Sequence, residues 1–95
     1  MANPIPKKLL QEVMERDEGL CQHCFGMGSH PHHIVPAGMG RMRTHRIENL
    51  VTLCFSCHSR THSEKSMREW CYEWSRERYG EVVDKLLSEK WSDTK

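Results

Sequence analysis

The sequence predicts a small α+β domain held together by one metal ion, and three observations lead to this class. Two C-x-x-C pairs, at positions 21/24 and 54/57, are separated by a loop, so each can supply half of a tetrahedral zinc site. Short apolar runs typical of strands lie between stretches with helical periodicity. The chain has 95 residues, of which 37% are hydrophobic. Its apolar core is therefore small, and a stabilising metal is expected.

The first half of the chain predicts one helix and two short strands. Four apolar side chains recur at helical spacing over residues 6–16, and Gly19 follows as an exit signal. After the first cysteine pair the chain is broken by glycine and proline, and "HHIVP" (32–36) reads as a short strand. A polar loop over residues 37–49 then leads to the second strand, "NLVTLC" (49–54).

Three helices are predicted after the second cysteine pair. The first covers residues 56–62. Ser66 and Glu69 form an S-x-x-E capping box, which predicts the start of the second helix, and Gly80 ends it. The third runs to about Trp91. The second helix carries one apolar stripe that predicts its core face: Met67, Trp70, Cys71 and Trp74.

Composition excludes several protein classes. Five cysteines leave Cys71 unpaired, which argues against a secreted disulfide framework. The amino-terminal stretch has no continuous apolar segment and no cleavage site, so we expect neither a signal peptide nor a membrane span, and a cytoplasmic location. "CFSCH" (54–58) matches the c-type haem attachment pattern. A haem would leave Cys21 and Cys24 unused, which favours zinc instead.

The histidines form a second candidate site. Six of the seven lie between His30 and His62. His58 and His62 are four residues apart and project from one helix face, where they can share a metal or simply be solvated. His32 and His33 are neighbours in a strand and point to opposite faces. If His32 joins the two helical histidines on a metal, His33 is left as a neutral imidazole suited to accept a proton from water.

Asn49 stands at the start of the second predicted strand. Its amide or its backbone carbonyl could fix the turn that accepts the Nδ1–H of His33, which leaves Nε2 free as the base. The same residue is also an ordinary turn residue before a strand, and His33 alone is equally compatible with a surface position.

Four segments, "CQHC", "HHIVP", "ENLVTLCFSCH" and "RTH", resemble the HNH endonucleases in identity and order. The resemblance covers about Leu9 to His62. It implies a small ββα-metal (His-Me finger) domain, with a structural Zn(Cys)4 site and flanking helices. The chain is then one domain: an N-terminal helix over residues 1–20, a zinc knuckle and ββα-metal core over 21–62, and C-terminal helices over 63–95.

Residue roles also follow from the resemblance. It implies that His33 is the general base, that Asn49 is the middle letter of the family name, and that His32 and His58 bind the catalytic metal. His62 is similar to the second histidine of the H-x-x-x-H helix in colicin-type nucleases and is the expected third ligand. His30 competes with His32, a position where many members carry aspartate or glutamate. The four cysteines would hold a structural zinc ion: Cys21, Cys24, Cys54 and Cys57.

The implied activity is hydrolysis of DNA phosphodiester bonds, by nicking or by double-strand cleavage. It would use one catalytic divalent metal, Mg, Mn, Ni, Co or Zn. The formal net charge is only +1, so we expect weak binding to double-stranded DNA. Nothing in the sequence resembles base readout, so we expect weak sequence specificity, with further specificity lent by a partner protein or a homodimer. No membrane partner is expected. Arginines beside the site form a candidate phosphate-binding patch, or a solvated surface: Arg41, Arg43, Arg46 and Arg60.

Two rival functions remain open at this point. One is a catalytically silent, zinc-stabilised DNA-binding or adaptor module of a phage packaging or restriction system. The presence of His33, Asn49 and His58 argues against it. The other is a thiol redox or metal-handling protein, which predicts reactive cysteines of low pKa.

Overall fold

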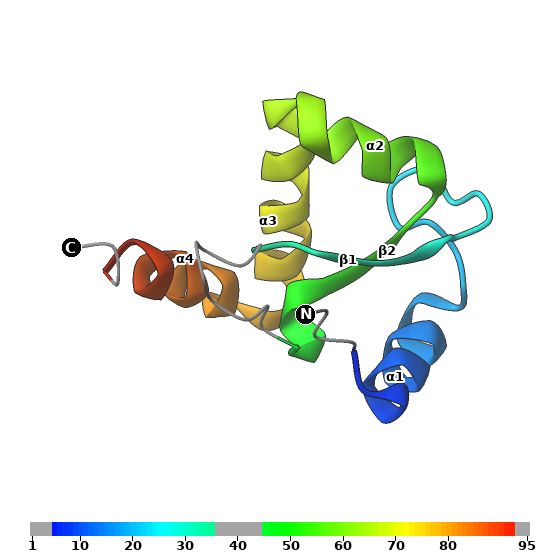
Figure 1. The fold of residues 1–95 in the computed structure, drawn as a ribbon, viewed down its shortest axis with the longest axis horizontal. Coiled ribbons are helices and arrows are strands. Elements are labelled where there is room, and N and C mark those ends of the chain that lie inside the picture. The colour runs from blue at the N-terminus through cyan, green and yellow to red at the C-terminus, as the bar shows by residue number, and fades with distance from the viewer. Residues whose placement is uncertain (1–4, 36–44, 93–95) are drawn as a thin grey trace.

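The computed structural model describes residues 5–35 and 45–92, without the side chains of residue 30 and residues 88–92. Its elements are α1 (Lys7–Asp17), β1 (His30–His33), the 3-10 helix η1 (Ile47–Asn49), β2 (Leu50–Leu53), α2 (Phe55–Ser63), α3 (Lys65–Tyr79) and α4 (Val82–Ser92). The hairpin lies at the centre, with α2 at one end and α1 at the other (Figure 1). The predicted α+β class is confirmed.

The strands pair antiparallel, and their register defines the sheet. It runs from His30 opposite Leu53 to His33 opposite Leu50. The first strand therefore begins two residues before the predicted one and ends at His33, because β2 offers only four residues to pair with. Pro31 lies inside β1 rather than before it. It is opposite Thr52.

A buried carboxylate joins α1 to the other edge of β2. Asp17 accepts the backbone N–H of Thr52 at Oδ2 (3.0 Å) and forms an ion pair with Arg16 (2.7 Å). The Arg16 guanidinium also donates to the carbonyls of Ile47 (2.7 Å) and Leu50 (2.5 Å), and lies 4.7 Å from the ring centroid of Trp74. The end of α1 is thus tied to η1, β2 and α3.

Only Glu64 separates α2 from α3, which corrects the predicted capping box. Glu64 is the C-cap of α2 and the N-cap of α3, so Ser66 is the second residue of the helix and not its cap. The backbone N–H of Glu64 donates to the Arg60 carbonyl (2.8 Å), and Arg68 donates to the Thr61 carbonyl (2.9 Å). The first bond caps α2, the second joins the two helices directly, and Ser66 lies in the first turn of α3.

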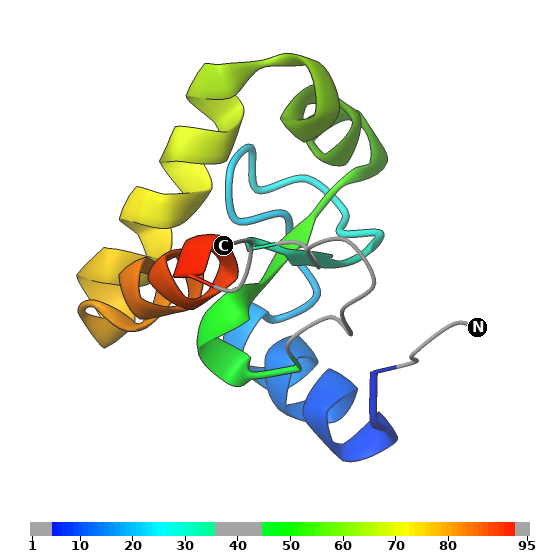
Figure 2. The same cartoon turned by 60° about the vertical axis from the view of Figure 1, so that its left-hand side comes forward.

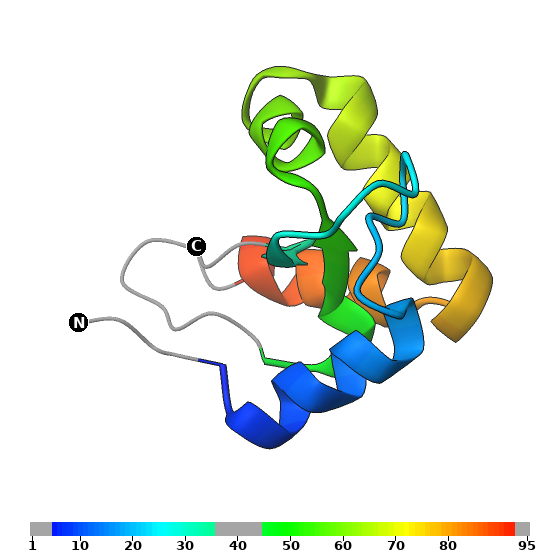
Figure 3. The same cartoon turned by 90° about the vertical axis from the view of Figure 1, so that its right-hand side faces the viewer.

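The core lies between the hairpin, α3 and α4. The predicted stripe of α3 faces it, since Met67, Cys71 and Trp74 are buried and Trp70 packs against the cluster. Burial, with the nearby Cys21 thiol, raises the pKa of Cys71 to about 12, so this fifth cysteine stays a neutral core thiol. α3 runs from the level of α2 down to α4 in the turned views (Figure 2 and Figure 3).

None of the helices in the described part of the chain combines the length and apolar character that crossing a bilayer requires. The predicted division into segments 1–20, 21–62 and 63–95 and the expected cytoplasmic location both stay predictions.

Candidate metal centres and catalytic residues

Four cysteines from two turns of the chain form a compact cluster. Their sulfur atoms all lie within 4.8 Å of one another, and those of Cys24 and Cys54 are 3.7 Å apart. Cys21 and Cys57 are buried, whereas Cys24 is exposed. Zinc–sulfur bonds of 2.3 Å in a tetrahedron place neighbouring sulfurs about 3.8 Å apart. The cluster therefore fits one zinc ion, as the spacing predicts.

Backbone turns fix these cysteines locally. The N–H of Cys24 donates to the Cys21 sulfur (3.4 Å), and the N–H of Cys57 donates to the Cys54 sulfur (3.4 Å). The first turn is closed by the Phe25 N–H on the Cys21 carbonyl (2.8 Å), with Phe25 at a positive φ of 64°. Local hydrogen bonds thus preorganise both halves of the site.

The thiols of the cluster have opposed acidities. Burial raises the pKa of Cys21, but N–H donors from Cys24, Cys54 and His23 outweigh this effect and lower the pKa to about 6. Burial and the neighbouring Cys54 and Cys21 thiols raise the pKa of Cys57. Four thiolates at such short range need a cation between them, which agrees with a metal site.

The rings of three predicted histidines, one on β1 and two on α2, form a row in space. The ring centroids of His32 and His58 are 5.0 Å apart, and those of His58 and His62 are 5.3 Å apart. Within the described residues, however, the four cysteines are the one group of three or more potential ligands close enough to hold a metal ion. The three histidine rings are neighbours, but their ligand atoms do not lie as close together as the four sulfur atoms do.

His33, the predicted base, contacts a histidine that the sequence reasoning left out. Its Nε2 lies 3.1 Å from Nδ1 of His45, and the two ring centroids are 5.2 Å apart. One imidazole must donate and the other accept, so the contact links the tautomers of the two rings. His45 is twelve residues after His33 in the chain, and no spacing rule predicts a contact between them.

Asn49 is fully buried and holds the chain just after β1. Its Oδ1 accepts the N–H of Val35 (2.8 Å), its Nδ2 donates to the Val35 carbonyl (3.2 Å), and its own carbonyl accepts the N–H of Ile34 (2.9 Å). The sequence predicted a bond to His33 Nδ1. The bonds described for Asn49 fix the two residues that follow His33, and the bond to His33 stays a prediction.

The structure describes two of the four arginines of the predicted phosphate-binding patch. Arg41 and Arg43 lie outside the described residues. Arg46 pairs with Glu48 (3.3 Å), and Arg60 pairs with Glu64 through two bonds of 3.0 Å. Both arginines thus already have a carboxylate partner.

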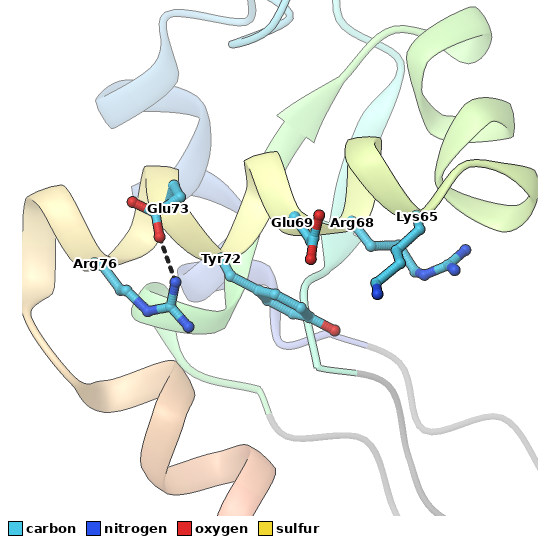
Figure 4. A pocket seen from close by; sticks show the side chains of 6 residues that line it. All are labelled: Lys65, Arg68, Glu69, Tyr72, Glu73 and Arg76. Atoms are coloured by element: carbon cyan, nitrogen blue, oxygen red, sulfur yellow. Dashed lines mark hydrogen bonds and ion pairs between the residues drawn. The ribbon is translucent and has the colours of Figure 1, made fainter.

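The outer face of α3 carries a shallow pocket of about 490 Å³ (Figure 4). Three basic and two acidic side chains surround it, and Arg76 is bound by Glu73 and by Asp84. The charges nearly balance, so the pocket does not favour a phosphate. It contains none of the predicted site residues; the residues lining it are Lys65, Arg68, Glu69, Tyr72, Glu73 and Arg76.

Fold and site together define a small α+β domain with a four-cysteine metal site beside a histidine cluster. The family comparison makes this more specific: residues 21–64 match the model of the HNH endonuclease family. The match confirms the resemblance noted in the sequence and covers β1, β2 and α2, the ββα-metal unit that the family implies. Comparison with curated proteins and comparison with solved structures each gave no match.

Proposed function

We propose that this chain is a metal-dependent endonuclease that hydrolyses phosphodiester bonds of double-stranded DNA, by nicking or by cutting both strands. HNH family membership supports a nuclease-type function. The observation that carries the proposal is the meeting of His32 on β1 with His58 on α2 at 5.0 Å, inside the segment that matches the family.

His32, His58 and His62 would hold the catalytic ion. Two imidazoles on one metal place their ring centroids roughly 4.5–5.2 Å apart, close to the separations of 5.0 and 5.3 Å between these rings. A divalent cation there, Mg, Mn, Ni, Co or Zn, supplies positive charge against the negative charge that grows on the phosphate. Imidazole ligands favour Ni, Co or Zn over Mg.

His33 is the proposed general base. Its Nε2 accepts a proton from the attacking water, which requires the ring's own proton on Nδ1. In that tautomer His45 Nδ1–H is the donor in the 3.1 Å contact, and the water takes over this position on Nε2 when DNA is bound. Asn49 supports the base by fixing Ile34 and Val35 behind it.

DNA would be held by its phosphates. Arg46 and Arg60 are themselves exposed and can exchange their carboxylate partners for a phosphate, which a guanidinium can bind through two parallel hydrogen bonds. Arg41 and Arg43 are proposed to act with them. Since the net charge is only +1, we expect binding that is weak, salt-sensitive and of low sequence specificity, with a partner protein or a second copy adding specificity.

One observation favours the rival function, a catalytically silent DNA-binding or adaptor module. The nitrogen that must accept the proton, Nε2 of His33, is in contact with His45. A silent module keeps this contact permanently, whereas a nuclease exchanges it for water. An activity measurement separates the two.

Plasmid nicking tests the proposal. Protein that retains its zinc is given Mg, Mn, Ni, Co or extra Zn singly, and conversion of supercoiled to open-circular DNA is followed. We expect metal-dependent conversion, reduced about 100-fold or more in His33→Ala, with zinc content and circular dichroism unchanged.

Ser59→Ala, on the exposed surface of α2, serves as the matched control and should cleave like the unaltered chain. No conversion with any ion in a folded protein, or equal conversion by His33→Ala, would contradict the proposal.

A further inference from the structure

His23 lies between the two cysteines of the first turn, and its ring faces the second cysteine turn, which carries Cys57. Its Nδ1 is 3.5 Å from the sulfur of Cys57. The ring also packs edge to face on Trp70 of α3, with centroids 4.8 Å apart and an interplanar angle of 85°. Trp70 is itself packed on the core cluster. His23 is therefore a half-buried, oriented imidazole that the proposed nuclease mechanism does not use.

Metal-bound sulfur atoms in this cluster need N–H donors, because four thiolates around one dication leave a net charge of −2 to be stabilised. Backbone groups supply most of them. The sulfurs with backbone donors, each followed by its donors, are Cys21 with Cys24, Cys54 and His23; Cys54 with Cys57; and Cys24 with Gly26.

Cys57 differs because it lies inside a helix. Gly26, the donor to Cys24, is two residues further along the chain, and the equivalent residue for Cys57 is Ser59. Ser59 belongs to α2, where backbone N–H groups point along the helix to the carbonyl four residues back. The Ser59 N–H is therefore directed along the helix and does not donate to the Cys57 sulfur as the Gly26 N–H donates to the Cys24 sulfur. The His23 ring lies beside the Cys57 sulfur instead.

We propose that His23 is a positioning residue of the four-cysteine metal site, whose Nδ1–H donates to the Cys57 thiolate. A metal-bound thiolate has no proton to give, so His23 must be the donor and carry its proton on Nδ1. The bond spreads the negative charge of the sulfur and holds it toward the metal, while Trp70 fixes the ring plane.

The inference is independent of catalysis, since it concerns only retention of the structural metal. It makes the first turn support a ligand of the second, and it links both to α3 through Trp70. Because Cys57 directly precedes His58, the contact also steadies the start of the helix that carries the proposed catalytic ligands.

Two variants of the zinc-loaded full chain test the bond. His23→Phe keeps an aromatic ring against Trp70 but has no N–H. His23→Asn gives up the ring but can place an amide N–H where Nδ1 stood. We expect His23→Phe to release zinc to a chelator about ten times faster than the unaltered chain, and His23→Asn to release it at close to the original rate.

Cobalt replacement supplies a readout that packing alone would not move. The sulfur-to-cobalt charge-transfer absorption should shift in His23→Phe and return toward its original position in His23→Asn. Equal zinc release and unchanged absorption in His23→Phe would overturn the proposal, as would faster zinc release in His23→Asn alone, which indicates a packing role.

If neither variant folds, the unaltered protein still decides the matter. Nitrogen-15 NMR of the zinc-loaded chain reports the tautomer of His23. A proton on Nδ1 supports the proposal, and a proton on Nε2 alone overturns it.

Discussion

The cysteine cluster and the histidine cluster lie side by side but are built differently. Each half of the cysteine site comes from one tight turn whose own backbone bonds set the sulfur positions, and all four sulfurs lie within 4.8 Å. The histidine rings come from β1 and from α2 and meet only through the fold, at 5.0 Å for His32 and His58. Local turns give a preformed site, whereas a site across two elements depends on the framework and on the bound ion.

The largest expected effect is loss of the cysteine site. Cys54→Ser should lose zinc and unfold the domain, because the free energy of zinc binding, about 10 kcal/mol or more, is here folding free energy. Zinc content and circular dichroism measure this. Cys71→Ala removes a buried cysteine outside the cluster and should keep both zinc and fold. A folded Cys54→Ser protein with one bound zinc would break the contrast between the two regions.

A smaller effect is expected when the framework of the histidine region is weakened. Asn49→Ala leaves the buried N–H and carbonyl of Val35 without the partners that the amide supplies. We expect a loss of about 2 kcal/mol in the free energy of unfolding with zinc present, measured by denaturant titration.

We expect the geometry of the cysteine cluster to be unchanged in this variant. The cobalt spectrum of Asn49→Ala is therefore expected to match that of the unaltered chain. An altered spectrum, or full stability, would show that the two regions are coupled differently from this account.

Much of the cysteine site could be predicted from the sequence because its information is local. Each C-x-x-C spacing predicts a turn that presents two sulfurs, and two such turns supply the four ligands of a tetrahedral site. Cys71 stands outside both pairs and falls on the core stripe of α3. The helices followed from periodicity in the same way. Among the helix signals, the capping box was wrong, since α2 and α3 are joined through Glu64 alone and α3 begins one residue before Ser66.

In the histidine region the sequence indicates residues whose roles stay predictions, and their contacts could not be predicted. The order of His32, His33, Asn49, His58 and His62 indicated a shared site. The strand register determines where β1 begins, and the fold places His45 against His33. Contacts of this kind, like that of His23 with Cys57, depend on side-chain orientation in the fold, which no spacing rule contains.

Binding of a second metal ion tests the central claim most directly, that one chain carries a preformed structural site and a separate histidine site. Mn²⁺ is titrated into protein that already holds one zinc ion, and free Mn²⁺ is followed by electron paramagnetic resonance. We predict one additional ion per chain, lost in His58→Ala and retained in His33→Ala, with the zinc ion kept in both variants. No second ion, or equal binding by His58→Ala, would contradict the account.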